Sequence, residues 1–217
     1  SLGADNTGNN NVAIGYQAGL ACTDAVQNVV IGSGAMKTST SDDGAVVIGY
    51  LAGRDMEGAT HTTIIGSACA VKLTTGDANI YIGTDTGPNG SAGTGDNNVG
   101  IGVNALNAVT SGYANVLIGK DAGKLITDGF DNVAVGAGAL DALTGGDYNT
   151  AVGRNALGAN TASGNTAFGR ECMGGNVSGT ENTAVGNGAL GVATGHYNTA
   201  MGSGALGSNT GSGNTGI

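Results

Sequence analysis

The sequence is poor in the residues that build most enzyme active sites. Its 217 residues include no tryptophan, two histidines and three cysteines, and only 11% are charged. His61 and His196 lie far apart in the chain, so they do not suit a catalytic triad or a metal cluster. Asp42 and Asp43 form an acidic pair that is typical of a solvated loop, and the stretch "GTGDNN" lacks the Gly-Lys-Ser/Thr of a phosphate-binding loop. We therefore predict that the protein is not an enzyme and uses no metal or other cofactor.

Proline, basic residues and long apolar runs are scarce as well. A single proline excludes collagen-like and proline-rich chains. Seven basic residues against 16 acidic ones give a net charge of −9, which disfavours nucleic acid and anionic membrane surfaces as partners. No apolar run approaches the ~18 residues of a membrane span, and there is no signal peptide, so we expect no membrane insertion. The odd number of cysteines also offers no disulfide framework.

Glycine is what the sequence has in excess, with 44 residues. One phrase recurs, as in "NNVAIGYQAG", "NNVGIGVNAL", "DNVAVGAGAL" and "ENTAVGNGAL". When the chain is aligned on the residue before the recurring glycine, the spacings are 16 or 17 residues, with one of 19. Such regularity indicates a solenoid, whose stacked units bury a core that no single unit could bury. These centre residues are Ile14, Ile31, Ile48, Ile65, Ile82, Ile101, Ile118, Val135, Val152, Phe168, Val185, Met201 and Ile217.

Strands fit this repeat better than helices. Common α-solenoid repeats have ~33–47 residues, and a glycine in every unit would destabilise a helix by ~1 kcal/mol each time. A β-branched residue stands two places before each centre, as Val12 does before Ile14, and shares a strand face with it. A short strand, a glycine bend and a second short strand fit the spacing. We predict an all-β, parallel β-solenoid of about twelve 16–17-residue coils. It would form a single domain over residues 1–217 and a rod about 60 Å long.

Other positions of the repeat are restricted too. The glycine after each centre predicts φ > 0 or a close backbone approach. Four places after the centre only small residues occur, and Cys69 and Cys172 stand there, so we expect buried free thiols. Leucine or methionine follows in the later coils and would fill a narrow core. Asparagine three places before the centre predicts a ladder of stacked amides that acts as scaffold. The asparagines are Asn11, Asn28, Asn79, Asn98, Asn115, Asn132, Asn149, Asn165, Asn182, Asn198 and Asn214.

The repeat also resembles two known families. "NNVAIG" followed by a small residue is similar to the repeat of the left-handed β-roll heads of trimeric autotransporter adhesins, although the adhesin repeat is shorter. "NTAVGRNAL" and "NTAMGSGAL" resemble repeats of phage tail-fibre proteins and related bacterial surface proteins. The resemblance covers nearly the whole chain. It implies a left-handed solenoid, a homotrimer, and a place at a cell surface or on a virion.

The two ends of the chain both fall inside a repeat. The first residues align with the run that begins at Ala205, and the last residues open a new unit. Uncapped solenoid ends expose strand edges, which promote pairing with another chain. We therefore expect either a fragment of a longer fibre or end-to-end self-assembly, with a homotrimer as the alternative. The candidate assembly residues are Ser1, Leu2, Asn214, Thr215 and Ile217.

Three functions fit these observations. The leading one is the non-enzymatic shaft of an extracellular filament or fibre, which would bind further copies of itself. The second is a receptor-binding or glycan-binding fibre or adhesin, with Tyr113, Phe130, Tyr148 and Tyr197 as a surface contact stripe that two coils interrupt. The third is ice binding by a threonine column nine places after the centre, although such hydroxyls also suit capping of backbone groups. That column is Thr23, Thr40, Thr74, Thr110, Thr127, Thr144, Thr161, Thr194 and Thr210.

Overall fold

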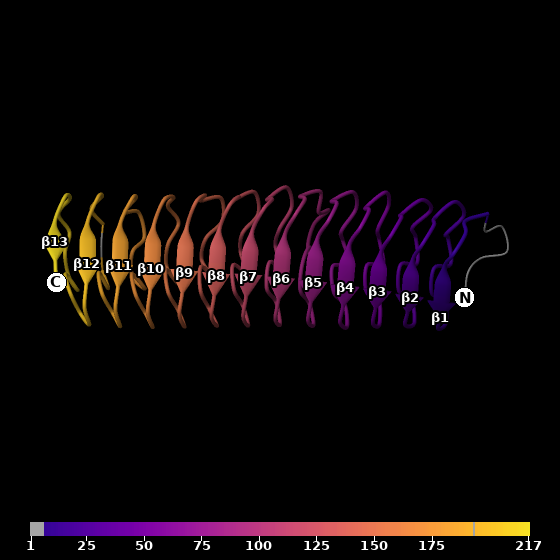
Figure 1. Ribbon diagram of the computed structural model, residues 1–217, viewed down its shortest axis with the longest axis horizontal. Coiled ribbons are helices and arrows are strands. Elements are labelled where there is room, and N and C mark those ends of the chain that lie inside the picture. Colours follow the sequence, from indigo (N-terminus) through magenta and orange to yellow (C-terminus); the bar gives the residue numbers. More distant parts are fainter. Residues whose placement is uncertain (1–6, 193) are drawn as a thin grey trace.

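The protein is an elongated rod of stacked coils (Figure 1). The computed structural model describes residues 7–192 and 194–217. Thirteen strands form one sheet in which each strand pairs with the next one along the chain, and the pairs are parallel. The described residues contain no helix, so the predicted all-β parallel solenoid is confirmed. The strands are β1 (Val12–Ile14), β2 (Val29–Ile31), β3 (Val46–Ile48), β4 (Thr63–Ile65), β5 (Ile80–Ile82), β6 (Val99–Ile101), β7 (Val116–Ile118), β8 (Val133–Val135), β9 (Thr150–Val152), β10 (Thr166–Phe168), β11 (Thr183–Val185), β12 (Thr199–Met201) and β13 (Thr215–Gly216).

The strands coincide with the repeat that the sequence displays. Each of β1 to β12 begins at the β-branched residue and ends at the centre residue two places later. Partners stand one repeat apart, so Val12 pairs with Val29 and Ile14 pairs with Ile31. This register recurs at each junction. Equivalent residues therefore form columns that run along the rod.

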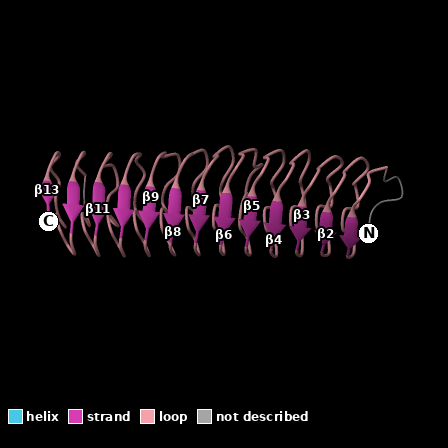
Figure 2. Cartoon of the chain, viewed as in Figure 1, coloured by secondary structure: helices cyan, strands magenta, loops and turns pink. Residues whose placement is uncertain are grey.

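The second short strand expected in each coil is not formed, and that prediction is wrong. Beyond each glycine the chain follows turns (Figure 2), and among the described residues one isolated bridge, between Leu73 and Gly93, lies outside the named strands. Coils are still joined there by backbone hydrogen bonds. The Met36 N–H, for example, donates to the Ala52 carbonyl at 2.9 Å. Stacking therefore continues around the coil where the backbone is no longer extended.

Left-handed backbone conformations explain why the second strand is missing. Besides the glycine directly after the centre, three positions of each coil have positive φ: four places before the centre, and three and five places after it. In one coil these are Asp131, Gly138 and Leu140, with φ of 53°, 66° and 55°. A left-handed residue bends the chain out of the extended conformation, and β-branched residues avoid it. None of the three columns contains valine, isoleucine or threonine, a signal that the sequence analysis missed.

The glycine after each centre satisfies both conditions predicted for it. At Gly136 the backbone has φ of 139°. A Cβ atom there would lie 2.5 Å from the carbonyl oxygen of Gly153 in the next coil. Two coils thus touch through their backbones at this point, and no side chain can be accommodated between them.

The residues of each strand divide between the core and the surface. The middle residue faces the core, so Val30, Leu117 and Ala134 are buried. The residues on either side of it lie at or near the surface. The valine, isoleucine and threonine side chains that mark the repeat therefore form the outer face of the sheet. The small and leucine columns are buried as predicted, for example at Ala139 and Leu140.

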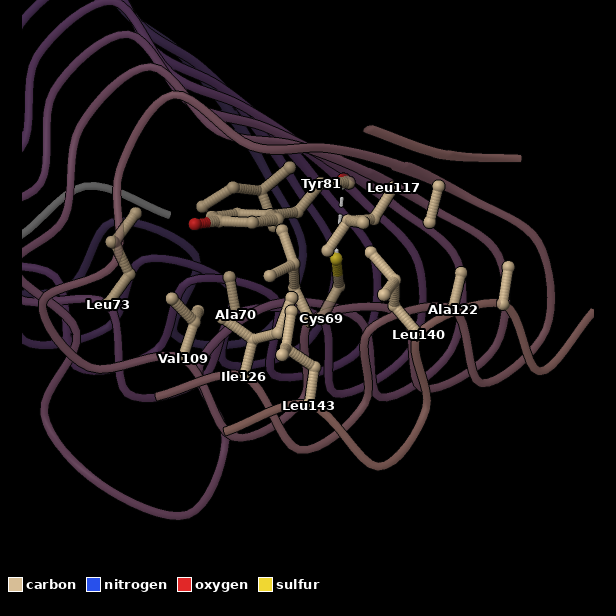
Figure 3. Packing of buried hydrophobic residues seen from close by; sticks show 14 of the residues in the cluster. Cys69, Ala70, Leu73, Tyr81, Val109, Leu117, Ala122, Ile126, Leu140 and Leu143 are labelled. Atoms are coloured by element: carbon tan, nitrogen blue, oxygen red, sulfur yellow. Dashed lines mark hydrogen bonds between the residues drawn. The ribbon is translucent and has the colours of Figure 1, made fainter. Parts of the chain in front are cut away.

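In most coils two core positions compensate for each other in size: where the inward residue of the strand is large, the left-handed residue of the same coil is small, and the reverse. Leu117 points inward from β7, and the left-handed position of that coil is Gly123, where a Cβ would lie only 2.4 Å from Leu117 Cδ1. In the next coil the inward residue is Ala134, and Leu140 occupies the left-handed position. Figure 3 shows Leu117, Ile126 and Leu140 packed together in the core. This exchange keeps the interior close-packed along the rod.

The three cysteines are free and buried, which confirms the prediction for Cys69 and Cys172 and assigns Cys22 as well. The Cys69 thiol donates a weak hydrogen bond to the Tyr81 carbonyl, and the Cys172 thiol donates one to Ala184. Burial raises the pKa of Cys69 to about 12 and that of Cys172 to about 11. Because the thiolate is the reactive form, these side chains are inert in the folded rod.

We expect a thiol reagent such as Ellman's reagent to leave all three cysteines unmodified in the folded protein at pH 8. After unfolding in guanidinium, three thiols per chain should react, since both the burial and the raised pKa are lost. A Ser203→Cys variant is the control, because Ser203 is exposed and a thiol there should react at once. Rapid modification of a native cysteine in the folded state would contradict the structure.

Candidate interaction surface

The asparagine column forms the predicted ladder. In one step, the Asn132 backbone N–H and its Nδ2 both donate to Asn115 Oδ1 at 3.1 Å, and Nδ2 also donates to the Gly146 carbonyl at 2.9 Å. Both asparagines are fully buried. Burying an amide is costly unless it is hydrogen-bonded, and here the bonds are made between coils. The column is therefore scaffold, as predicted.

The ladder is interrupted where Ala45 and Thr62 replace asparagine. Asp42 lies on the neighbouring column, which is otherwise glycine and alanine, and its side chain is fully buried. The expectation of a solvated Asp42 is therefore wrong. Its carboxylate oxygens make no hydrogen bond to a described residue. Burial raises the pKa of Asp42 to about 6, although the nearby Ser39 hydroxyl opposes this shift, and the Asp43 charge raises it further.

The threonine column nine places after the centre is used inside the stack. Thr110 Oγ1 donates to the Thr127 carbonyl at 3.0 Å, and Thr161 Oγ1 donates to the Val177 carbonyl at 2.8 Å. These hydroxyls thus satisfy turn carbonyls of the next coil. This is the capping role that the sequence analysis set beside ice binding.

A second kind of cap recurs five places before the centre. At seven coil junctions the side chain at this position accepts a hydrogen bond from the backbone N–H of the equivalent residue in the preceding coil. Asp147 Oδ1 accepts from the Phe130 N–H at 3.1 Å, and His196 Nδ1 accepts from the Thr180 N–H at 3.1 Å. His196 therefore has a structural role. The rings of Tyr113 and Phe130 occupy the same position but offer no such acceptor.

Three of the four residues of the predicted contact stripe are brought together. The rings of Tyr113 and Phe130 stack with their centroids 4.9 Å apart and their planes 2° apart. Tyr148 meets Phe130 edge-on at 5.2 Å. Tyr113 and Tyr148 are 45% and 61% exposed. Tyr197 lies apart from them and contacts His196. We call Tyr113, Phe130 and Tyr148 the aromatic corner.

The outer face of the sheet carries exposed apolar side chains along the whole rod. We call the outward side chains of β1 to β12 the strand face. They repeat as two parallel rows, one from the first residue of each strand and one from the last. Isolated exposed apolar residues are ordinary, but a row that continues from coil to coil is a candidate contact surface. Its exposed large side chains are Val12, Ile14, Ile80, Ile118, Val133, Val135, Phe168, Val185 and Met201.

Two borders of mixed polar and aromatic residues flank the strand face. The border after the strands carries the residue two places beyond each centre, including the exposed cations Lys120, Arg154 and Arg170. Lys120 lies 3.2 Å from an Asp121 oxygen, and Arg170 lies 3.7 Å from a Glu171 oxygen. Arg154 makes no ion pair or side-chain hydrogen bond with a described residue. The border before the strands carries the aromatic corner.

The predicted assembly residues fall partly within the described chain. The Asn214 N–H donates to Asn198 Oδ1 at 2.9 Å and extends the ladder, and Thr215 pairs with Thr199 in β13. Ile217 is 97% exposed beyond that strand. Ser1 and Leu2 lie outside the described residues.

The described residues hold no group of three or more histidine, cysteine or acidic side chains placed to bind a metal ion. They also form no helix that could span a bilayer. The one hollow of note is shallow and has a single charged side chain, Glu171, among Asn155, Val192 and four glycines. No protein family, curated protein or solved structure matches the chain. Its function is therefore argued from the rod and its surfaces.

Proposed function

We propose that the protein is a non-enzymatic structural rod that forms the shaft of an extracellular filament or fibre by self-association. The observation that carries this proposal is the unbroken sheet, in which every strand from β1 to β13 pairs with its neighbour in the same register. In such a stack each coil is stabilised by its contacts with the coils on either side. Coils can therefore be added without changing the existing contacts, and the number of coils sets the length of the rod. The same register lets further copies of the repeat continue the sheet at an edge strand.

The use of polar side chains supports a mechanical role. The asparagine ladder, the threonine hydroxyls and the caps before the strands all bond one coil to the next. These groups are therefore committed to the stack. A rod built in this way resists bending because each coil is held at several points around its circumference.

Side-by-side association of parallel copies is the second candidate, as in the homotrimeric fibre given above as the alternative to end-to-end assembly. The strand face supports it. Twelve strands that each occupy ~4.8 Å of the rod, with a width of about 10 Å, give a contact of about 600 Å². That approaches the ~800 Å² per partner of a stable interface. We propose that further copies of this chain cover the strand face. The face repeats along the whole rod at the spacing of the coils, and a second parallel copy presents side chains at the same spacing.

The extracellular location, at a cell surface or on a virion, is proposed from the resemblance to fibre and adhesin repeats. Binding of a receptor or glycan remains the alternative function, and the exposed rings of the aromatic corner favour it. Binding of the purified protein to a glycan array would support that alternative.

Light scattering and negative-stain images of the full chain test the proposal. We expect elongated particles that contain several copies and dissociate on dilution. Val135→Asp should abolish side-by-side association, because it places a charge in the strand face, whereas Ile217→Asp or deletion of residues 1–8 should shorten end-to-end filaments. Val177→Asp is the control, since Val177 is an exposed turn residue away from both surfaces. If the full chain were a single rod, with one copy per particle, at every concentration, self-association would be refuted.

A further inference from the structure

We propose that Arg154 of one copy binds the aromatic corner of a neighbouring copy, where Phe130, Tyr148, Asp131 and Asp147 receive its guanidinium. This inference rests on the side-by-side association proposed above. It names a specific contact that would fix the orientation of the copies, which the uniform strand face alone does not fix.

In a ring of parallel copies, Arg154 of one copy and Tyr148 of the next lie at the same height along the rod. Tyr148 and Arg154 stand two residues before the start and two residues after the end of one strand, β9 (Thr150–Val152). They therefore lie on opposite borders of the strand face in the same coil. In a closed ring of parallel copies around an axis along the rod, the border after the strands of one copy meets the border before the strands of the next, without axial shift. Arg154 of one copy then faces Tyr148 of its neighbour.

The chemistry of the two sites is complementary. Arg154 is the cation of its border without an ion pair among the described residues, while Lys120 and Arg170 have adjacent carboxylates. At the corner, Asp131 is exposed and its carboxylate makes no hydrogen bond to a described residue. The seven residues directly before each of β6 to β9 include four aspartates in all and no cation, whereas Lys120 and Lys124 follow the end of β7. A guanidinium can stack on an aromatic ring and bind a carboxylate through two N–H groups at once.

The fold itself does not call for aromatic residues at this corner. Seven other residues in the column of Tyr113 and Phe130 are aspartate, serine or histidine, and their side chains cap the preceding coil. The remaining four, Asn9, Val26, Thr60 and Thr180, are small or medium-sized residues without an aromatic ring. The two aromatic residues give up that cap, and their rings stack on each other at the surface instead. A role in contact with another molecule accounts for this exchange.

Self-association of the full chain, measured by analytical ultracentrifugation, tests the contact. We expect Arg154→Asp and Asp131→Arg each to weaken association at least tenfold, because each places like charges together. The double variant exchanges the two charges and should return the dissociation constant to within threefold of the original. Tyr148→Ala should also weaken association. Two controls should change it less than threefold: Arg170→Gln, on the same border but paired within its own chain, and Tyr197→Ala, an exposed tyrosine outside the corner.

The outcomes separate this inference from the function on which it rests. If the unaltered chain stays monomeric, side-by-side association fails and the inference fails with it. If the chain associates but Arg154→Asp and Asp131→Arg have no effect, or the double variant is not rescued, the Arg154 contact alone is overturned. Circular dichroism of each variant verifies that the rod is still folded. As a direct readout, a chain carrying Tyr148→Cys and Arg154→Cys should form disulfide-linked oligomers on oxidation.

Discussion

Gly136→Val should destabilise the rod by about 3 to 6 kcal/mol, through strain and overpacking together. A β-branched residue is strained at φ of 139°, and its Cβ would lie 2.5 Å from the Gly153 carbonyl oxygen. The oxygen belongs to the backbone and the Cβ is fixed by the backbone of residue 136, so no flexible side chain can move aside. Thermal unfolding followed by circular dichroism measures the loss. Hydrogen exchange should show it first in the coils of β8 and β9.

Gly90→Val is the matched control for this substitution. Gly90 has no left-handed φ, and a Cβ there would meet no atom within 4 Å. The control should change stability by less than about 0.5 kcal/mol, as surface substitutions usually do. If both variants melted at the same temperature, the glycine column would be ordinary extended backbone and the packing of coils described above would be wrong.

Asp42→Asn should flatten the stability profile between pH 4 and 7, so that the variant gains on the unaltered protein as the pH rises, by at most about 3 kcal/mol at pH 7. Because the pKa of Asp42 is raised from 3.8 to about 6, the folded state binds the proton more tightly than the unfolded chain does. The contribution of Asp42 is therefore fully present below pH 4 and is lost as the pH rises through 6. Above that pH the fold holds a buried carboxylate without a hydrogen bond.

Chemical unfolding at several pH values measures this effect. Asp131→Asn is the control, because Asp131 is exposed and its removal should leave the slope between pH 4 and 7 unchanged. Asp55 acts in a different window, since the Arg54 and Lys72 side chains lower its pKa to about 2 and its contribution is lost only in stronger acid. A profile of the unaltered protein that is flat between pH 4 and 7 would show that Asp42 is solvated.

The strands could be predicted from the sequence because steric preference and repetition act together. A β-branched residue, a centre and a glycine recur at one spacing, and strands that pair with their own repeat must align at that spacing. The alternation did not show which row faces inward. Valine and isoleucine suit a core and an outer face equally well, and the buried middle residues range from alanine to Leu117 and Tyr81, so residue type alone did not decide between the rows.

The turns could not be predicted in the same way. Their left-handed positions are marked only by the absence of valine, isoleucine and threonine from three columns of the repeat. Leu140 is buried at φ of 55°, a conformation that a single leucine would seldom suggest. Asp42 is harder still, because an acidic pair such as Asp42 and Asp43 is typical of a solvated loop, yet Asp42 is buried. The aromatic corner lies between these cases. Its residues were identified from their repeat positions, but the stacking of Tyr113 on Phe130 depends on the spacing of the coils.

The orientation of the hydrogen bonds has a consequence for the behaviour of the rod under tension. Strands lie across the rod (Figure 1), so the bonds that join successive coils point along its axis. A force applied at the two ends therefore loads them one junction at a time, as in a zipper, and not all together in shear. Each coil that opens releases about 17 residues, or up to ~55 Å of extended chain, in place of ~4.8 Å of rod. Under load the rod would therefore lengthen one coil at a time, in similar steps of roughly 50 Å each.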